Sequence, residues 1–288
     1  MVRLDGGMNS TRRRETHGST ASRRTRATEP ALLTAAVLIA GLAGCNATTS
    51  GDGFGVATGG TVTVFAAASL TDVFGELEAE FEAVNPGVDV VISYGGSSAL
   101  AAQLVEGAPA EIFAAASPAT MAIVVDAGIA ADPTIFATNE LQIAVPAGNP
   151  GTVVGLADFA RDDAVIAICA AEVPCGAVAS ATFAAAGITP APDTLEQDVR
   201  AVLTKVVLGE VDAGLVYRTD VIAAGDTVDG IDLVSASDAA SQKILDAATT
   251  DYPIVVLPTA SSAATEFLKF VLGETGVRIL AEAGFGSR

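Results

Sequence analysis

Apolar residues along the chain follow two alternating periods, one typical of β-strands and the other typical of α-helices. Short runs rich in Val, Ile and Phe, such as residues 61–66 (TVTVFA) and 88–93 (VDVVIS), predict strands. Between them, apolar residues from Leu70 to Phe81 recur at the spacing of a helix, which we expect over residues 70–83. The alternation continues with expected strands over residues 112–115, 142–145, 165–168, 213–217 and 252–257, and expected helices over 99–106, 121–127, 177–186, 199–208, 264–272 and 276–283. This order predicts an α/β protein with mostly parallel sheets flanked by helices.

The first 44 residues break this pattern and indicate an export signal. Residues 1–30 carry seven arginines against three acidic residues, and residues 31–43 (ALLTAAVLIAGLA) are nearly all apolar. Such an apolar run rises about 20 Å as a helix, too little for a hydrocarbon core of about 30 Å, so the segment is typical of a secretory signal peptide. Residues 42–45 (LAGC) resemble a bacterial lipobox, which implies that Cys45 is lipidated and becomes the first mature residue. The alternative is an ordinary signal peptide with a chance cysteine.

We therefore expect residues 1–44 to be removed and the protein to be exported, with Cys45 holding it to the outer face of the cell membrane. Residues 46–60 (NATTSGDGFGVATGG) are rich in Gly, Thr and Ser and have no periodicity. This composition predicts a flexible tether over residues 45–60, followed by the folded body.

Charge and composition exclude several functions. The chain has 15 Lys and Arg against 34 Asp and Glu, a net charge of −19. Residues 45–288 keep 8 of the basic and 31 of the acidic residues, a net charge of 8 − 31 = −23, which argues against a nucleic-acid partner. The one histidine, His17, lies in the export signal, so the exported part has no His-based catalysis and no His-ligated metal. A Ser hydrolase also lacks support, because the sequence has no G-x-S-x-G motif, and we expect a protein that is not an enzyme.

The junctions between strands and helices carry small residues and hydroxyl groups. In α/β sheets, ligands bind where strands end and helices begin. Ser69 follows three alanines at the first junction, and two glycines precede Ser97 at the second. Hydroxyl donors, free N–H groups and the positive end of a helix dipole suit an anion. The structural alternatives are a capping box of Ser69 with Asp72, and a Gly-rich turn with an N-cap serine.

Three later junctions have the same character, at residues 172–177, 196–200 and 215–220. The last of them ends a predicted strand with the phenol of Tyr217, although an isolated tyrosine is more often a half-buried surface residue.

Seven short motifs occur in an order that resembles the periplasmic molybdate-binding proteins of ABC transporters. They are FAAASL (65–70), GGSSAL (95–100), GAPAEIFAAAS (107–117), VPCG (173–176), DVR (198–200), GLVY with TD (214–220) and DYPI (251–254). The resemblance covers essentially all of residues 61–288. It implies the type II periplasmic binding protein fold, in which two α/β lobes are joined by two hinge crossings and enclose the ligand. We expect residues 61–138 and 258–288 to form lobe 1, and residues 139–257 to form lobe 2.

The resemblance also implies a ligand set of hydroxyl and backbone donors. The expected contacts are the hydroxyls of Ser69, Ser97 and Tyr217 and the backbone N–H groups of Cys175 and Val199. Molybdate is an ionised tetrahedral dianion that only accepts hydrogen bonds, and tungstate should bind equally well. A protonated oxyanion would leave its own O–H unpaired, at a cost of about 1–3 kcal/mol. The family further implies an ABC permease and ATPase as partners, no cofactor and no cation site, and we expect a monomer.

Other ligands remain open at this point. The same fold could bind sulfate, another oxyanion or a small organic anion. Ferric ion is less favoured, because iron proteins of this architecture use clustered tyrosines and this chain has only Tyr94, Tyr217 and Tyr252.

Three charged residues near the expected site leave their roles open. Arg218 stands where relatives commonly have a small residue. Asp72 and Asp198 carry negative charge close to the expected anion, and we expect their carboxylates to face helix backbone or solvent.

Two cysteines remain besides Cys45. Because an exported compartment permits disulfides, we expect Cys169 and Cys175 to be bridged. The bridge would staple the loop that carries the third anion contact, and its short loop gives a stabilisation of about 2 kcal/mol. A free thiol pair with a redox role is the alternative, although the C-x-x-C motif is missing. Cys175 also departs from the alanine common in the family, which a backbone donor tolerates.

Overall fold

The computed structural model of the protein describes residues 59–234 and 237–287. The expected signal peptide, the lipidated Cys45 and nearly all of the expected tether lie outside these residues. Among the residues described, no helix has both the length and the apolar character needed to cross a membrane.

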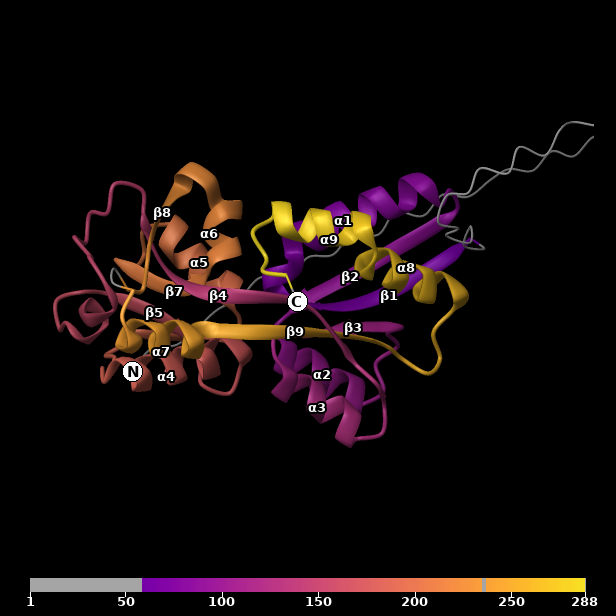
Figure 1. Ribbon diagram of the computed structural model, residues 1–288, viewed down its shortest axis with the longest axis horizontal. Coiled ribbons are helices and arrows are strands. Elements are labelled where there is room, and N and C mark those ends of the chain that lie inside the picture. The colour runs from indigo at the N-terminus through magenta and orange to yellow at the C-terminus, as the bar shows by residue number, and fades with distance from the viewer. Residues whose placement is uncertain (1–58, 235–236, 288) are drawn as a thin grey trace, which may run out of the picture. The chain divides into compact units, whose positions relative to one another are not determined.

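The strands of the described residues join in one continuous sheet (Figure 1). Their order is β2-β1-β3-β9-β4-β7-β5-β6, and β8 pairs with β4 beside this path. The strands are β1 (Gly60–Ala67), β2 (Val88–Gly95), β3 (Ile112–Ala114), β4 (Thr134–Pro146), β5 (Ile166–Cys169), β6 (Thr194–Glu196), β7 (Ala213–Tyr217), β8 (Val228–Ile231) and β9 (Thr249–Val256).

The expected parallel pairing is found towards the two ends of the sheet. Strand β1 runs parallel to β2 and β3, and β5 runs parallel to β6 and β7. The antiparallel pairs all involve β4 or β9, which pair with each other and connect the two parallel parts. These two strands therefore make one mixed sheet out of two parallel groups.

Helices cover both faces of the sheet (Figure 1). The α-helices are α1 (Thr71–Val84), α2 (Ser97–Val105), α3 (Pro118–Asp126), α4 (Pro174–Ala186), α5 (Val199–Val207), α6 (Arg218–Ala224), α7 (Ala239–Ala248), α8 (Ser262–Leu272) and α9 (Glu274–Glu282). Three short 3-10 turns are η1 (Ala68–Leu70), η2 (Leu156–Ala160) and η3 (Gly225–Thr227).

Helix α1 shows how the local sequence sets an element. Its apolar residues, among them Phe74, Leu77 and Phe81, lie at helical spacing and are buried on one face. The helix ends at Asn85, whose side-chain amide donates to the carbonyl oxygen of Phe81 at 2.9 Å, and the following Pro86 cannot continue it.

Buried apolar side chains form separate cores at the two ends of the sheet. The first core packs α1, α8 and α9 on one face of β1–β3, with Phe81 and Phe267 in edge-to-face contact, and α2 and α3 on the other face. The second core is built on β5 and β7 and includes α4 and α5, with Phe159 against Phe183. We use these two names, first core and second core, below.

The chain passes between the two cores along β4 and β9. On β4, Ala137 packs in the first core and Leu141 packs in the second. At β9, Ala248 just before the strand belongs to the second core, and Tyr252 belongs to the first. The second passage therefore falls where α7 ends and β9 starts, at Thr249.

Candidate anion-binding site

A small cavity lies where the two cores face each other. All five residues expected to contact a ligand line it: Ser69, Ser97, Cys175, Val199 and Tyr217. The rest of the lining consists of Ala67, Ala68, Gly95, Gly96, Ala116, Val173, Pro174, Gln197 and Asp198. The cavity volume is about 20 Å³, and a buried water needs about 10–15 Å³ of such space. The cavity therefore suits one compact group rather than an extended organic molecule.

Ser69 lies in η1, between the end of β1 and the start of α1, and is buried. Its Oγ is 2.7 Å from the Oη of Tyr252, and either oxygen could donate in that pair. The capping box considered for Ser69 and Asp72 is absent, because α1 has Leu70 at its N-cap and no side-chain cap. The hydroxyl of Ser69 therefore does not cap the start of α1.

Ser97 is the first residue of α2 and is 2 % exposed. The backbone N–H of Ala116 donates to its Oγ at 3.1 Å. The N-cap position of α2 belongs to Gly96, which excludes the N-cap role considered for this serine. Since the oxygen of Ser97 already accepts from the protein, its own hydroxyl proton can be donated into the cavity.

Cys175 and Val199 lie in the first turns of α4 and α5, respectively. The first four N–H groups of a helix have no acceptor within the helix. The first turns of α2, α4 and α5 all contribute residues to the cavity lining, so the positive ends of three helix dipoles are directed towards the same small space.

Tyr217 ends β7 with its side chain fully buried in the cavity wall. Its Oη has no hydrogen-bond partner among the described residues. Burial, and secondly the nearby carboxylate of Asp220, raise the pKa of the Tyr217 phenol, so it remains a neutral donor. An unpaired buried hydroxyl costs about 1–3 kcal/mol and calls for an explanation. Within residues 59–234 and 237–287, two further buried hydroxyls are unpaired, those of Tyr94 and Thr194, but neither residue lines the cavity.

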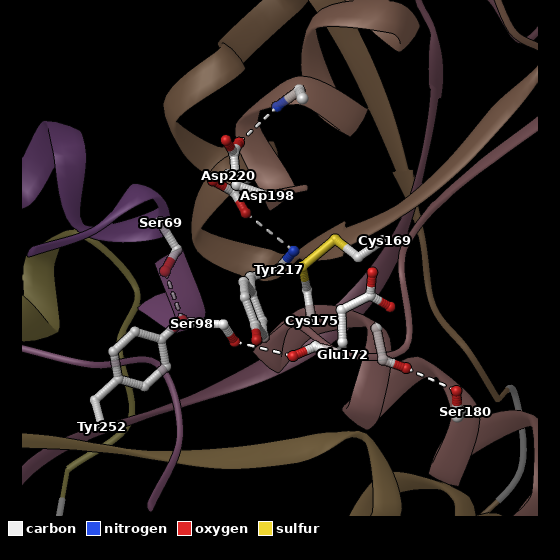
Figure 2. The surroundings of a disulfide bond; sticks show 12 residues. Ser69, Ser98, Cys169, Glu172, Cys175, Ser180, Asp198, Tyr217, Asp220 and Tyr252 are labelled. Atoms are coloured by element: carbon white, nitrogen blue, oxygen red, sulfur yellow. Dashed lines mark hydrogen bonds between the residues drawn. A yellow bond between two sulfur atoms is a disulfide. The ribbon is translucent and has the colours of Figure 1, made fainter. Parts of the chain in front are cut away.

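Cys169 and Cys175 form a disulfide next to the cavity (Figure 2). Their Cα atoms lie 5.7 Å apart, and the bond ties the end of β5 to the first turn of α4. This confirms the expected pairing and excludes the free thiol pair. The bond fixes the loop that positions the backbone N–H of Cys175.

Polar contacts between the two cores lie beside the cavity. Ser98 Oγ donates to the carbonyl oxygen of Glu172 at 2.9 Å (Figure 2). Arg200 Nη1 donates to Asp72 at 2.8 Å and to Asp220 at 3.4 Å. Arg200 and Asp220 belong to the same side as the second core, whereas Asp72 is on α1, so this ion pair joins the two sides.

The three acidic residues near the cavity use their carboxylates elsewhere. Asp198 caps α5 by accepting from the backbone N–H of Ala201 at 2.9 Å, which confirms that it faces helix backbone. The side chain of Asp72 is 54 % exposed, as expected, but it also binds Arg200, which the sequence did not reveal. Asp220 is fully buried and accepts from the backbone N–H of Tyr217 at 3.0 Å. Its burial raises its pKa to about 7 in spite of Arg200.

Two residues of this region were not expected at the site. Gly96 approaches the carbonyl oxygen of Gln197 so closely that a Cβ atom on Gly96 would collide with it. Tyr252 contacts Ser69 from below the cavity. Both residues stand in motifs quoted above, GGSSAL and DYPI, which is the signal that could have singled them out. Arg218, in contrast, does not line the cavity.

Comparisons with known proteins identify the family and the fold. Residues 62–286 match the family described as bacterial extracellular solute-binding protein. The Molybdate-binding protein ModA of Mycobacterium tuberculosis strain H37Rv is 37% identical over 258 residues, which cover 88% of this chain and 95% of that protein. The periplasmic molybdate-binding protein of Azotobacter vinelandii has a similar structure, with a TM-score of 0.66, 20% identity, and coverage of 79% of this chain and 99% of that one.

The fold alone does not select the ligand. The sulfate-binding protein SubI of Mycobacterium tuberculosis H37Rv is also similar in structure, with a TM-score of 0.66 and 19% identity, covering 78% of this chain and 86% of that one. These relatives are solute-binding proteins and not enzymes. The family match over most of the chain, together with the two cores and the cavity between them, shows that this protein belongs to the bacterial extracellular solute-binding proteins.

Proposed function

We propose that this protein captures molybdate, and equally tungstate, in the cavity and delivers it to an ABC permease driven by an ATPase. The observation that carries the proposal is that all five residues expected to donate hydrogen bonds, from both cores, line one small cavity. The 37% identity to a protein named as molybdate-binding, over nearly the whole of both chains, supports the choice of ligand.

The cavity offers donors, and two oxygens near it already accept hydrogen bonds from the protein. The Oγ of Ser97 accepts from Ala116, and Asp198 accepts from the N–H of Ala201. The phenol of Tyr217 is neutral and free to donate. A fully deprotonated tetrahedral oxyanion can accept from all these donors at once, whereas a protonated one brings a further donor into a site already lined by donors.

The size of this interaction supports useful affinity. Hydrogen bonds to a charged group contribute about 1.5–3 kcal/mol each, so five of them supply roughly 10 kcal/mol before the costs of binding. Micromolar to nanomolar dissociation constants follow from such values.

The proposal includes export and attachment. The basic segment, the short apolar run and the lipobox-like residues 42–45 support secretion and a lipid on Cys45, which would keep the binder at the outer face of the membrane. We propose the first and second cores as the two lobes of a monomer, with β4 and β9 as the hinge crossings.

Calorimetric titration of the purified protein with molybdate, tungstate, sulfate and phosphate tests the proposal. We expect tight binding of the first two anions and no heat from phosphate. Tighter binding of sulfate than of molybdate would replace the proposed ligand by the alternative that the structural similarity to a sulfate-binding protein offers. Absence of heat with molybdate, from protein whose circular dichroism shows it folded, would refute the assignment.

A further inference from the structure

One ion pair joins the two sides of the cavity at its edge. Arg200 Nη1 on α5 lies 2.8 Å from the Oδ2 of Asp72 on α1 and 3.4 Å from the Oδ1 of Asp220. Neither Arg200 nor Asp72 lines the cavity, so a compact ligand held there meets neither side chain. The proposed ligand set gives no role to the negative charge of Asp72, and its contact with Arg200 is the feature that can supply one.

The two ends of this ion pair are close in sequence to residues expected to bind the anion. Arg200 directly follows Val199, the expected backbone donor on the side of the second core, and both lie in the first turn of α5. Asp72 lies three residues after Ser69, an expected donor on the side of the first core, and η1 leads directly into α1 between them. Attraction between Arg200 and Asp72 therefore draws donors from the two sides towards each other across the cavity.

The pair has one end that is held in place and one that can separate. The side chain of Asp220 is fully buried, and it accepts from the backbone N–H of Tyr217 at 3.0 Å while its other oxygen faces Arg200. Arg200 is thus fixed on its own side by a residue that also holds the backbone of a cavity-lining tyrosine. The side chain of Asp72 is 54 % exposed, so water can replace Arg200 as its partner when the two sides part.

We propose that Arg200 and Asp72 form a latch across the cavity, which is made when the two sides close on the anion and broken before the anion leaves. Both are positioning residues, because they act on the donors and do not touch the ligand. The inference rests on the proposed function and deepens it. Charge repulsion alone predicts that removing the carboxylate of Asp72 strengthens the binding of an anion. The latch predicts the opposite, namely faster release and weaker binding.

The release rate of radiolabelled molybdate from the purified protein, chased with an excess of unlabelled molybdate, tests the latch. We expect the Asp72→Asn variant to release molybdate about threefold faster than the wild type, because partly exposed ion pairs change an equilibrium constant by up to about fivefold. The association rate should change little, since the pair forms after the anion has entered. The difference in release between variant and wild type should shrink as salt is raised to about 1 M, which screens the pair.

Glu76→Gln is the matched control, because Glu76 lies one turn further along α1, is likewise exposed and is not a partner of Arg200. It removes the same charge and should release molybdate at the wild-type rate. In the background of Arg200→Gln, the change Asp72→Asn should no longer speed release. Equal acceleration by Glu76→Gln, or by Asp72→Asn in that background, would overturn the latch. Should Arg200→Gln fail to fold, the comparison of the two α1 variants decides by itself.

The outcomes separate this inference from the function on which it rests. Wild-type protein that binds molybdate, together with unchanged or slower release from Asp72→Asn, would overturn the latch alone. Folded wild-type protein that does not bind molybdate would overturn the proposed function instead.

Discussion

Gly96 offers the sharpest test of how the two cores close around a ligand. A Cβ atom built on Gly96 would lie well inside 3.0 Å of the carbonyl oxygen of Gln197, closer than real Cβ atoms approach. The obstacle is a backbone oxygen, which cannot rotate away as a flexible side chain could. Gly96 belongs to the junction before α2 and Gln197 to the junction before α5, so the collision falls between the two sides of the cavity.

The Gly96→Ala variant should therefore bind molybdate weakly and still fold normally. The two sides must part by at least about half an ångström to restore 3.0 Å, and hydrogen bonds lengthened to about 3.6 Å are lost. Loss of one or two bonds worth about 1.5–3 kcal/mol each raises the dissociation constant roughly 100-fold. The backbone of Gly96, at φ −58° and ψ 125°, is one that alanine adopts readily. The free energy of unfolding without ligand should change by less than about 1 kcal/mol.

Calorimetry with molybdate and chemical denaturation without it measure these two quantities. The neighbouring Gly95→Ala is the matched control, because its Cβ would meet only the side chain of Leu100 at an ordinary 3.6 Å. We expect near-wild-type binding for that variant. Equal affinity of Gly96→Ala, Gly95→Ala and wild type would refute the idea that binding requires this close approach.

Three further variants probe the surroundings of the cavity. Tyr217→Phe should raise the free energy of unfolding without ligand by about 1 kcal/mol, because an unpaired buried hydroxyl disappears. It should also weaken molybdate binding at least tenfold. A variant that loses stability in urea denaturation as well as affinity in calorimetry would contradict this prediction. Replacing Cys169 and Cys175 together by serine should cost about 2 kcal/mol of stability in denaturation of the oxidised protein, and wild type under reducing conditions should match the variant. Burial raises the pKa of Asp220 to about 7, from an ordinary value of 3.8. The folded protein therefore holds that proton up to about pH 7, and the free energy of unfolding should fall as pH rises from about 4 to 7. The Asp220→Asn variant should lack the part of this fall in the free energy of unfolding that the Asp220 proton causes. Identical pH profiles of stability for the variant and the wild type would disprove the assignment.

Helices and strands with a clear apolar period could be predicted from the sequence. Short elements, and elements whose apolar period is interrupted, could not. The helix over residues 70–83 was expected because Leu77 and Phe81 repeat at helical spacing, and α1 covers Thr71–Val84. Only residues 142–145 of β4 were expected, since its earlier part contains polar residues and a register shift between Ile135 and Ala137 that interrupt the alternation. Helix α6 has seven residues, too few to show a period. Strand β6 has three residues, none fully buried.

The five residues expected at the site were carried over from the family resemblance through short motifs beside helix starts, and all five line the cavity. The contacts that bring them together could not be derived in this way. Ser69 and Tyr252 are separated by 183 positions along the chain, and Arg200 reaches Asp72 over 128 positions. Such pairs depend on how β4 and β9 place the two cores, and no local period or propensity carries that information.

The proposed arrangement explains how a protein with a net charge of −23 over residues 45–288 can hold an anion. Among the described residues that line the cavity, none is lysine or arginine. Arg200, beside the cavity, is bound by Asp72 and Asp220 and joins the two sides. Charge complementarity therefore comes from oriented neutral groups, namely helix N-termini and hydroxyls, which do not change protonation near neutral pH. Distant carboxylates are screened by salt over about 8 Å, so the fixed directions of these few donors decide which oxyanion is bound.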